Sequence, residues 1–523
     1  MRIILLFFLI ACSLSSTAQD FDVLHYNYAI QLNDQNDTIK GIALITLVKK
    51  SDKQTIALDL ASTNRAGKGM TAIVKNNTEV IHFNHSADLL TVDLPKYKKG
   101  DTLQIVVEYK GVPTDGLVIS KNKYGDRTFF ADNWPNRAHF WIPCKDVPND
   151  KASFEFSVTA PYQYKVISNG TLVETKELAN GKKLTHWKED TPLPTKVMVI
   201  GAAKFAVKEF PDSPPGIPVS AWIYEQDSTK GFHDYAPAPE ILKFFSSHIA
   251  PYPYKKLANV QSKTIFGGME NAGAIFYAEN SVTGKGDVED LLAHEIAHQW
   301  FGDMASEKSF THLWLSEGFA TYFTDIFWQH KYGDEAFNKR LKKERDEVIQ
   351  FVKTSNHAVV DSVSSYMDLL NPNSYQKGAW ILHMLRNEVG DSVFQSIIQS
   401  YYQQYKGSNA DTKDFEAVAE KVSGKELTWF FDQWLYRSGI PKLSANWKRD
   451  GNKIKLEIKQ SGSQTFQFPL EIAIVSADGK MTNQKFYINS KEEEFKIESS
   501  SDPAKLILDP NTKLLFEGGI SPK

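Results

Sequence analysis

The sequence predicts a multidomain α+β protein with a strand-rich segment first, a mostly helical segment second and a strand-rich segment last. The chain has 523 residues, enough for about three domains at roughly 100–200 residues each. Apolar residues recur at every second position up to about residue 207, then at three- and four-residue spacing, then again at every second position. We therefore expect an N-terminal β domain over 19–207, a helical domain over 208–442 and a C-terminal β domain over 443–523.

The strand segments show alternation and turn signals. Leu103, Ile105, Val107 and Tyr109 alternate with polar neighbours, as do Ile454, Leu456 and Ile458 near the C-terminus. The pairs Asn169-Gly170, Asn180-Gly181 and Asp478-Gly479 are typical of tight turns, and the last predicts a hairpin. In the middle segment, helical spacing predicts helices over 287–301, 320–329, 335–352 and 375–388.

Composition excludes several classes of protein. Hydrophobic residues make up 42% and charged residues 24% of the chain, as in soluble globular proteins. The net charge of −3, without a basic run, argues against a nucleic-acid-binding protein. Beyond the N-terminus no stretch approaches 18 consecutive apolar residues, so no transmembrane helix is predicted there.

The first 18 residues predict a signal peptide and hence export to a periplasm or to the medium. Met1-Arg2 precedes an apolar run over 3–10 and small residues ending at Ala18, the pattern of a secretory signal. Cleavage after Ala18 would release a soluble protein. Alternatively, residues 9–12 resemble a bacterial lipoprotein signal, in which Cys12 carries a lipid that is the only membrane contact we expect. Cys144 then has no partner for an intramolecular disulfide and is expected to pack in the interior.

A zinc motif lies within the first predicted helix. His294-Glu295-Ile296-Ala297-His298 is an H-E-x-x-H sequence, which places both imidazoles on one helix face. Glu317 follows at the start of the next helical stretch, where an antiparallel helix could bring it to the histidines as a third ligand of one zinc ion. Glu295 is then free to accept a proton from a water molecule activated by the metal.

Two flanking motifs add candidate residues. Gly267-Gly268-Met269-Glu270-Asn271 is suited to a strand edge that holds a peptide, with Glu270 facing a substrate amine; the alternative is a flexible turn with an exposed glutamate. Tyr375, in Tyr375-Gln376-Lys377-Gly378, could donate a hydrogen bond to a developing oxyanion, or could be an aromatic residue that only packs.

Together these motifs resemble the aminopeptidase N family of zinc metallopeptidases, the gluzincins, which also includes the leukotriene hydrolase. The family marks are G-x-M-E-N, H-E-x-x-H with a third ligand at this spacing, and Y-x-K-G, all present in the family's order. The similarity extends to residues 141–152, to Tyr252-Pro253-Tyr254 and to residues 430–435.

The resemblance implies a saddle-shaped N-terminal β domain, a thermolysin-like catalytic domain and a small C-terminal β-sandwich. It implies that one zinc ion is held by His294, His298 and Glu317, and that Glu295 is the general base. Glu270, within the substrate-binding segment Gly267, Gly268, Met269, Glu270 and Asn271, would bind the free α-amine, and Tyr375 would stabilise the oxyanion. The expected activity is removal of single amino acids from peptides with a free N-terminus.

Three departures from the family pattern bear on substrate choice. The chain is too short for the large helical C-terminal domain of many members, so we expect none. A Glu or Gln that often helps bind the amine is replaced by the neighbourhood of Asp132, Asn133 and Trp134, and either Asp132 or Asn133 could substitute. Ala272 stands where some members have a tryptophan.

Two other functions remain open at this point. A thermolysin-like endopeptidase would share the zinc motif but cleave substrates with blocked termini, and Glu270 would be dispensable. A catalytically inactive binding protein could use the same scaffold, although the presence of Glu295 and Tyr375 argues against it.

Overall fold

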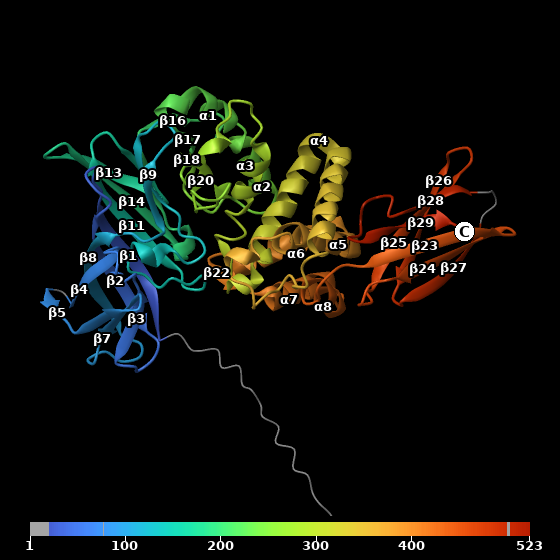
Figure 1. Ribbon diagram of the computed structural model, residues 1–523, viewed down its shortest axis with the longest axis horizontal. Helices are drawn as coiled ribbons and strands as arrows, with labels where there is room; N and C mark the ends of the chain where they lie inside the picture. The colour runs from blue at the N-terminus through green and yellow to red at the C-terminus, as the bar shows by residue number, and fades with distance from the viewer. Residues whose placement is uncertain (1–19, 77, 499–502) are drawn as a thin grey trace, which may run out of the picture.

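The computed structural model describes residues 20–76, 78–498 and 503–523. The strand-rich, helical and strand-rich parts follow one another along the molecule, coloured blue to cyan, green to orange, and orange to red in Figure 1. This order confirms the predicted α+β class. The predicted signal peptide over 1–18, with Cys12, lies outside the described residues.

The N-terminal part is built on one large sheet. In β8 (Thr102–Val112) the alternation of Leu103, Ile105, Val107 and Tyr109 is confirmed, because all four side chains are buried. Cys144 is buried and has a free thiol. The large sheet also contains β1 (Phe21–Gln31), β2 (Ile39–Lys49), β4 (Gly69–Asn76), β5 (Glu79–Val80), β11 (Ala152–Pro161), β13 (Thr171–Leu178) and β14 (Lys182–Leu193). Its strand order is β13-β14-β11-β1-β2-β8-β4-β5.

Two smaller sheets complete this part. One has the order β3-β7-β6 and the other the order β12-β15-β10-β9, the strands being β3 (Thr55–Asp59), β6 (Phe83–Ser86), β7 (Leu89–Asp93), β9 (Leu117–Lys121), β10 (Arg127–Ala131), β12 (Lys165–Ser168) and β15 (Ile200–Ala203).

The middle part begins with a five-stranded sheet whose edge strand leads to the candidate site. Its strands are β16 (Phe205–Glu209), β17 (Val219–Tyr224), β18 (Leu257–Ser262), β19 (Gly268–Met269) and β20 (Ala274–Ala278). They lie in the order β16-β17-β18-β20-β19, so among the described strands β19 pairs with β20 alone. The expected domain boundary at 207/208 falls inside β16, which pairs with β17; the middle sheet therefore begins slightly earlier than the sequence pattern indicates.

Helices make up most of the remainder of this part. They are α1 (Ser228–Asp234), α2 (Ala238–His248), α3 (Glu289–Ala297), α4 (Trp314–Phe351), α5 (Gly378–Val389), α6 (Asp391–Tyr405), α7 (Thr412–Ser423) and α8 (Thr428–Leu435). The stretch predicted over 320–329 lies within α4 and that over 335–352 ends one residue beyond it; α4 is interrupted at Gly333 with φ 84°. The short strands β21 (Ala305–Glu307) and β22 (Ser408–Ala410) pair in parallel.

The C-terminal part consists of two sheets, with orders β27-β24-β23-β29 and β26-β25-β28. Its strands are β23 (Lys442–Asp450), β24 (Lys453–Gln460), β25 (Phe468–Ser476), β26 (Met481–Ile488), β27 (Glu492–Glu498), β28 (Pro503–Leu508) and β29 (Glu517–Pro522). The hairpin predicted at Asp478-Gly479 is confirmed, since β25 and β26 pair antiparallel across it. Rings of Phe486 and Phe495, one from each sheet, lie 4.6 Å apart, so the two sheets share apolar contacts.

Buried lysines join the N-terminal part to the segment that follows α3. Lys196 and Glu307 form an ion pair of 2.5 Å (Nζ to Oε1) with almost no exposed surface. Lys151 Nζ donates to the carbonyl oxygens of Asp303 at 3.1 Å and Met304 at 2.9 Å. Among the described residues, no helix combines the length and apolar character needed to cross a membrane.

Candidate active site

The two histidines of the zinc motif lie at the end of α3 and face the first turn of α4. Leu292, Ala293, Ile296 and Ala297 bury the other side of α3, so the 3.6-residue period turns the histidines toward α4. The Nε2 atoms of His294 and His298 are 3.1 Å apart, and Glu317 Oε2 lies 3.3 and 3.2 Å from them.

The spacing of these three atoms suits a zinc ion. Ligands held at the zinc–nitrogen and zinc–oxygen distances in tetrahedral geometry lie about 3.3–3.5 Å from one another. His298 Nδ1 lies 3.0 Å from the carbonyl oxygen of Phe301, and donation of its proton to that oxygen leaves Nε2 as the metal-binding nitrogen. In the described part of the chain, this is the only group of three such side chains close enough to share an ion.

Glu295 lies between the metal ligands and the edge strand β19. It is buried, and this burial, together with the nearby carboxylates of Glu270 and Glu317, raises the pKa of Glu295 well above its usual value. A Cβ atom on Gly268 would lie 2.2 Å from Glu295 Oε1. The Glu295 carboxylate therefore occupies the space that a side chain at position 268 would need. Position 267 is different, because a Cβ there meets nothing within 4 Å.

A cavity of about 620 Å³ contains the candidate ligands and most of the predicted substrate segment. Gly267, Gly268, Met269 and Glu270 line it, together with Glu295 and Tyr375. Asn271 does not line it: its side chain is fully buried, and both of its amide atoms have no hydrogen-bond partner among the described residues.

Tyr375 is brought to the histidines by a close helix crossing. It lies in a π-helical turn, Asn373–Lys377, directly before α5, and its ring stacks on that of His294 with centroids 5.9 Å apart. Gly378 and Gly318 touch at the crossing of α5 and α4, where a Cβ on Gly318 would be 2.8 Å from Gly378 Cα. Burial raises the pKa of the Tyr375 phenol, so it is a donor at neutral pH.

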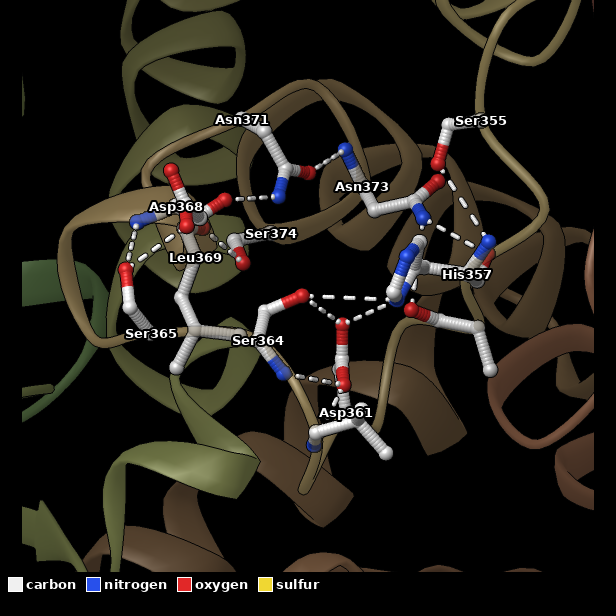
Figure 2. Close-up of polar contacts among 12 residues, drawn as sticks. Ser355, His357, Asp361, Ser364, Ser365, Asp368, Leu369, Asn371, Asn373 and Ser374 are labelled. Atoms are coloured by element: carbon white, nitrogen blue, oxygen red, sulfur yellow. Dashed lines mark hydrogen bonds and ion pairs between the residues drawn. The ribbon is translucent and has the colours of Figure 1, made fainter.

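The loop before Tyr375 is held by its own polar groups (Figure 2). Asp361 accepts hydrogen bonds from the backbone N–H and the hydroxyl of Ser364, and His357 Nδ1 lies 2.8 Å from Asp361 Oδ2. Asn373 Nδ2 donates to the carbonyl oxygen of His357 at 3.0 Å, and Ser374 Oγ donates to that of Leu369 at 2.7 Å. These contacts anchor the π-helical turn that carries Tyr375.

Neither polar residue proposed as the second amine-binding group lines the cavity. Asp132 is buried, pairs with Arg137 at 3.1 Å and accepts the backbone N–H of Ile265 at 3.0 Å. Asn133 is also buried and donates to the carbonyl oxygens of Thr195 and Met198. Both side chains are therefore used for ion pairs and hydrogen bonds inside the fold and are not available to a substrate amine.

The sequence pattern assigns no role to two residues near the site. Trp134 lines the cavity, and its indole contacts Phe266 and Phe310 edge to face. Gln299 is fully buried directly after His298. Each contacts residues far away in the sequence, and residue spacing within one segment cannot predict such contacts.

Comparison with known proteins agrees with this geometry. Residues 23–197 match the Peptidase M1 N-terminal domain, and residues 234–434 match the Peptidase family M1 domain. The glutamyl aminopeptidase of Rattus norvegicus is 26% identical over 84% of this chain and 50% of its own length. Probable aminopeptidase 2 of Sulfurisphaera tokodaii is 28% identical over 86% of this chain and 58% of its own length. The chain thus spans little more than half the length of these curated relatives.

A solved structure shares the fold. The crystal structure of Legionella pneumophila aminopeptidase A in complex with aspartic acid superposes with a TM-score of 0.82 at 18% identity, covering 96% of this chain and 60% of that one. Because both family domains match in order, cover most of the described chain and contain the candidate ligands, this chain belongs to peptidase family M1.

Proposed function

We propose that this protein is a zinc-dependent aminopeptidase that hydrolyses the first peptide bond of peptides with a free N-terminus. The observation that carries the proposal is that Glu270 lines the same cavity as His294, His298 and Glu317. A buried carboxylate beside a metal site can bind the ammonium group of a peptide and fix which bond lies over the metal. The names of the relatives agree with this activity.

The assigned roles follow from the chemistry of each side chain. A zinc ion held by His294, His298 and Glu317 supplies Lewis acidity toward a carbonyl oxygen and a water molecule. Glu295 accepts the proton of the attacking water and delivers it to the leaving amine. Tyr375 donates its phenolic proton as a hydrogen bond to the oxyanion, which lowers the barrier because charge develops there in the transition state.

The peptide's direction follows from the two ends of α3. The backbone of Glu270 contacts Gln299 just beyond the C-terminal end of α3, whereas Asp290 lines the cavity near its N-terminal end. Along the chain, the candidate ligands His294 and His298 lie between Asp290 and Gln299. A peptide whose amine lies at Glu270 therefore extends past the metal toward Asp290 and the neighbouring turns of α4.

The test is hydrolysis of a panel of aminoacyl amides, each beside its N-acetylated counterpart. We expect cleavage of free-amine substrates only, loss of activity with a chelator, recovery on adding zinc, and loss in Glu295→Gln. Glu270→Ala should raise KM for free-amine substrates. Equal cleavage of the acetylated compounds would establish the endopeptidase alternative. A zinc-loaded protein inactive on both amides and longer peptides would establish the binding-protein alternative.

We also propose that the protein is exported. The support is the sequence pattern of residues 1–18 alone. The mass of the mature protein, purified from its native cells, separates the two routes: cleavage after Ala18 leaves an unmodified chain, whereas lipidation leaves Cys12 as the first residue with an added acyl mass. An intact Met1 on the mature protein would exclude both.

A further inference from the structure

Gln299 uses its whole hydrogen-bonding capacity inside the protein. The side-chain amide has two N–H donors and an oxygen with two lone pairs. Nε2 donates to the carbonyl oxygen of Glu270 at 2.6 Å and to Asp303 Oδ2 at 3.0 Å. Oε1 accepts from the backbone N–H of Gly273 at 2.7 Å and lies 3.2 Å from the hydroxyl of Tyr252, whose single proton it shares with the carbonyl oxygen of Lys256 at 3.1 Å. The amide is therefore fixed in one orientation.

Two of these bonds hold both ends of one short segment. Glu270 to Gly273 connects the edge strand β19 to β20 and turns at Gly273, where φ is +67°. Gln299 contacts the first carbonyl and the last N–H of this connection, and Ala274 N closes the turn on the carbonyl oxygen of Asn271 at 2.9 Å. These two bonds thus fix the position and orientation of the Glu270 backbone relative to Gln299.

Gln299 is also the residue that follows the metal ligand His298. The backbone of the candidate amine anchor is therefore bonded to the immediate neighbour of a candidate metal ligand. Gln299 does not line the cavity, so it touches no substrate. Gln299 therefore acts on a substrate through the distance between Glu270 and the candidate metal site.

The same connection is supported from the N-terminal part. Asn169 Nδ2 donates to the carbonyl oxygen of Ala272 at 2.8 Å, and Lys151 donates to the backbone of Asp303, the acid that orients the Gln299 amide. The 270–273 connection is thus held from two sides: by Asn169 of the N-terminal part, and by Gln299 just beyond the helix α3 that carries the candidate metal ligands.

We propose that Gln299 is a positioning residue that sets the spacing between the amine anchor Glu270 and the metal site, and thereby the preference for a free N-terminal amine. The proposal rests on the function proposed above. Misplacement of a bound group by about 1 Å can cost about 100-fold in rate or affinity, so loss of these bonds should be visible as a loss of amine recognition.

The experiment compares binding of leucine hydroxamate with that of 4-methylpentanoyl hydroxamate, which lacks only the α-amine. Both carry the same metal-binding group. The dissociation constant of the des-amino compound divided by that of leucine hydroxamate therefore reports amine recognition without turnover. Gln299→Met removes all four bonds. Gln299→Glu keeps the acceptors for Gly273 and Tyr252 but loses both donors, which gives a second variant with a smaller change of volume. Zinc content is measured for each.

The matched control is Gln261→Met. Gln261 is also a fully buried glutamine of the middle part, with its amide bonded to Asp227 and to the backbone of Tyr224 and Glu279, and none of these contacts involves the 270–273 connection. It reports the effect of losing a buried amide in general.

We expect both Gln299 variants to reduce the ratio by about 10- to 100-fold, with zinc content and affinity for the des-amino compound kept, and Gln261→Met to leave the ratio unchanged. An unchanged ratio in zinc-loaded Gln299→Glu, or an equal reduction in Gln261→Met, would overturn the proposal. If the wild-type protein itself binds both compounds equally, the role of Glu270 in the proposed function fails, and the role of Gln299 fails with it.

Discussion

Gly268 and Glu295 lie so close together that one additional carbon on Gly268 would fall 2.2 Å from the Glu295 carboxylate oxygen. A side chain at position 268 of β19 therefore has no room unless the carboxylate of Glu295, the proposed general base, moves away.

This contact makes Gly268→Ala a specific test of the catalytic geometry. The methyl group would displace the Glu295 carboxylate, and we expect kcat to fall by about 10²- to 10⁴-fold, the usual contribution of a general base. Steady-state kinetics on an aminoacyl amide measures it. Gly267→Ala is the control, because a Cβ there meets nothing within 4 Å. Comparable losses in the two variants would contradict this explanation.

The buried pair Lys196–Glu307 predicts a large stability effect. Although burial alone would lower the pKa of Lys196, Glu307 raises it above the usual value, so the Lys196 ammonium is charged at neutral pH. Lys196→Met leaves Glu307 buried without its partner and should destabilise the protein by about 3–5 kcal/mol, as measured by urea denaturation.

The double variant Lys196→Met/Glu307→Gln removes both charges and should recover most of that loss. Lys453→Met, at an exposed pair with Glu498, serves as the control and should leave the denaturation midpoint unchanged. A single Lys196→Met variant as stable as the wild type would show that the pair contributes nothing.

His383 predicts a loss of stability in mild acid. Its Nε2–H donates to the carbonyl oxygen of Thr512 at 2.9 Å, and its Nδ1 accepts from the Tyr322 hydroxyl at 3.1 Å. Burial lowers the pKa of His383 to about 3, whereas in the unfolded chain it is about 6.5. Between these values the unfolded state binds more protons, so stability falls as the pH falls below about 6.5.

The size of this effect is at most about 1.4 kcal/mol per pH unit. We expect His383→Gln, which keeps a donor for Thr512, to lose less stability between pH 7 and pH 5 than the wild type does. His82→Gln, at a histidine whose side chain is 81% exposed, should follow the wild-type profile. Identical profiles for wild type and His383→Gln would exclude this source of acid sensitivity.

The cavity wall near Glu270 predicts a preference for apolar N-terminal residues. Trp134, Phe266 and Met269 line the cavity, Met269 directly precedes Glu270, and the Trp134 ring contacts that of Phe266. Among the described lining residues the lysine and arginine are Arg340 and Lys343 on α4, and Arg340 is already paired with Asp290 and Asp325. Lys343 is paired with Glu347, so an acidic side chain would find no unpaired lysine or arginine among the described lining residues of the cavity.

We expect kcat/KM for leucine or phenylalanine amides to exceed that for glutamate amide by about tenfold or more, the range that apolar pockets achieve. Trp134→Ala should reduce the value for phenylalanine amide more than that for alanine amide. A preference for glutamate amide would show that another group balances the charge.

The sequence alone predicts what depends on local spacing. The helix period places His294 and His298 on one face, and Glu317 lies on the next long helix, so the candidate metal site can be inferred from about 25 residues. The alternation in β8 and the hairpin at Gly479 are equally local. The exact start of the middle sheet is not, because β16 is assigned by its pairing with β17 rather than by its own pattern.

The remaining features depend on contacts between distant segments. Gln299 meets Glu270 and Gly273, which precede it by more than 25 residues, and nothing in its neighbourhood distinguishes it from an exposed glutamine. Asp132 and Asn133 have polar side chains of the kind that binds an amine. In the fold, however, both form hydrogen bonds to buried backbone groups instead. Trp134 reaches the cavity only because the N-terminal strands pack beside it.

The position of β19 at the end of its sheet has a consequence for the physical state of a substrate. A strand edge offers main-chain N–H and C=O groups that are the same for every peptide, and they can be used only by a chain that is itself extended over several residues. A folded protein would have to fray at its N-terminus before it could bind. Its rate of trimming would then be governed by the opening of its own end, and flexible oligopeptides would be consumed first.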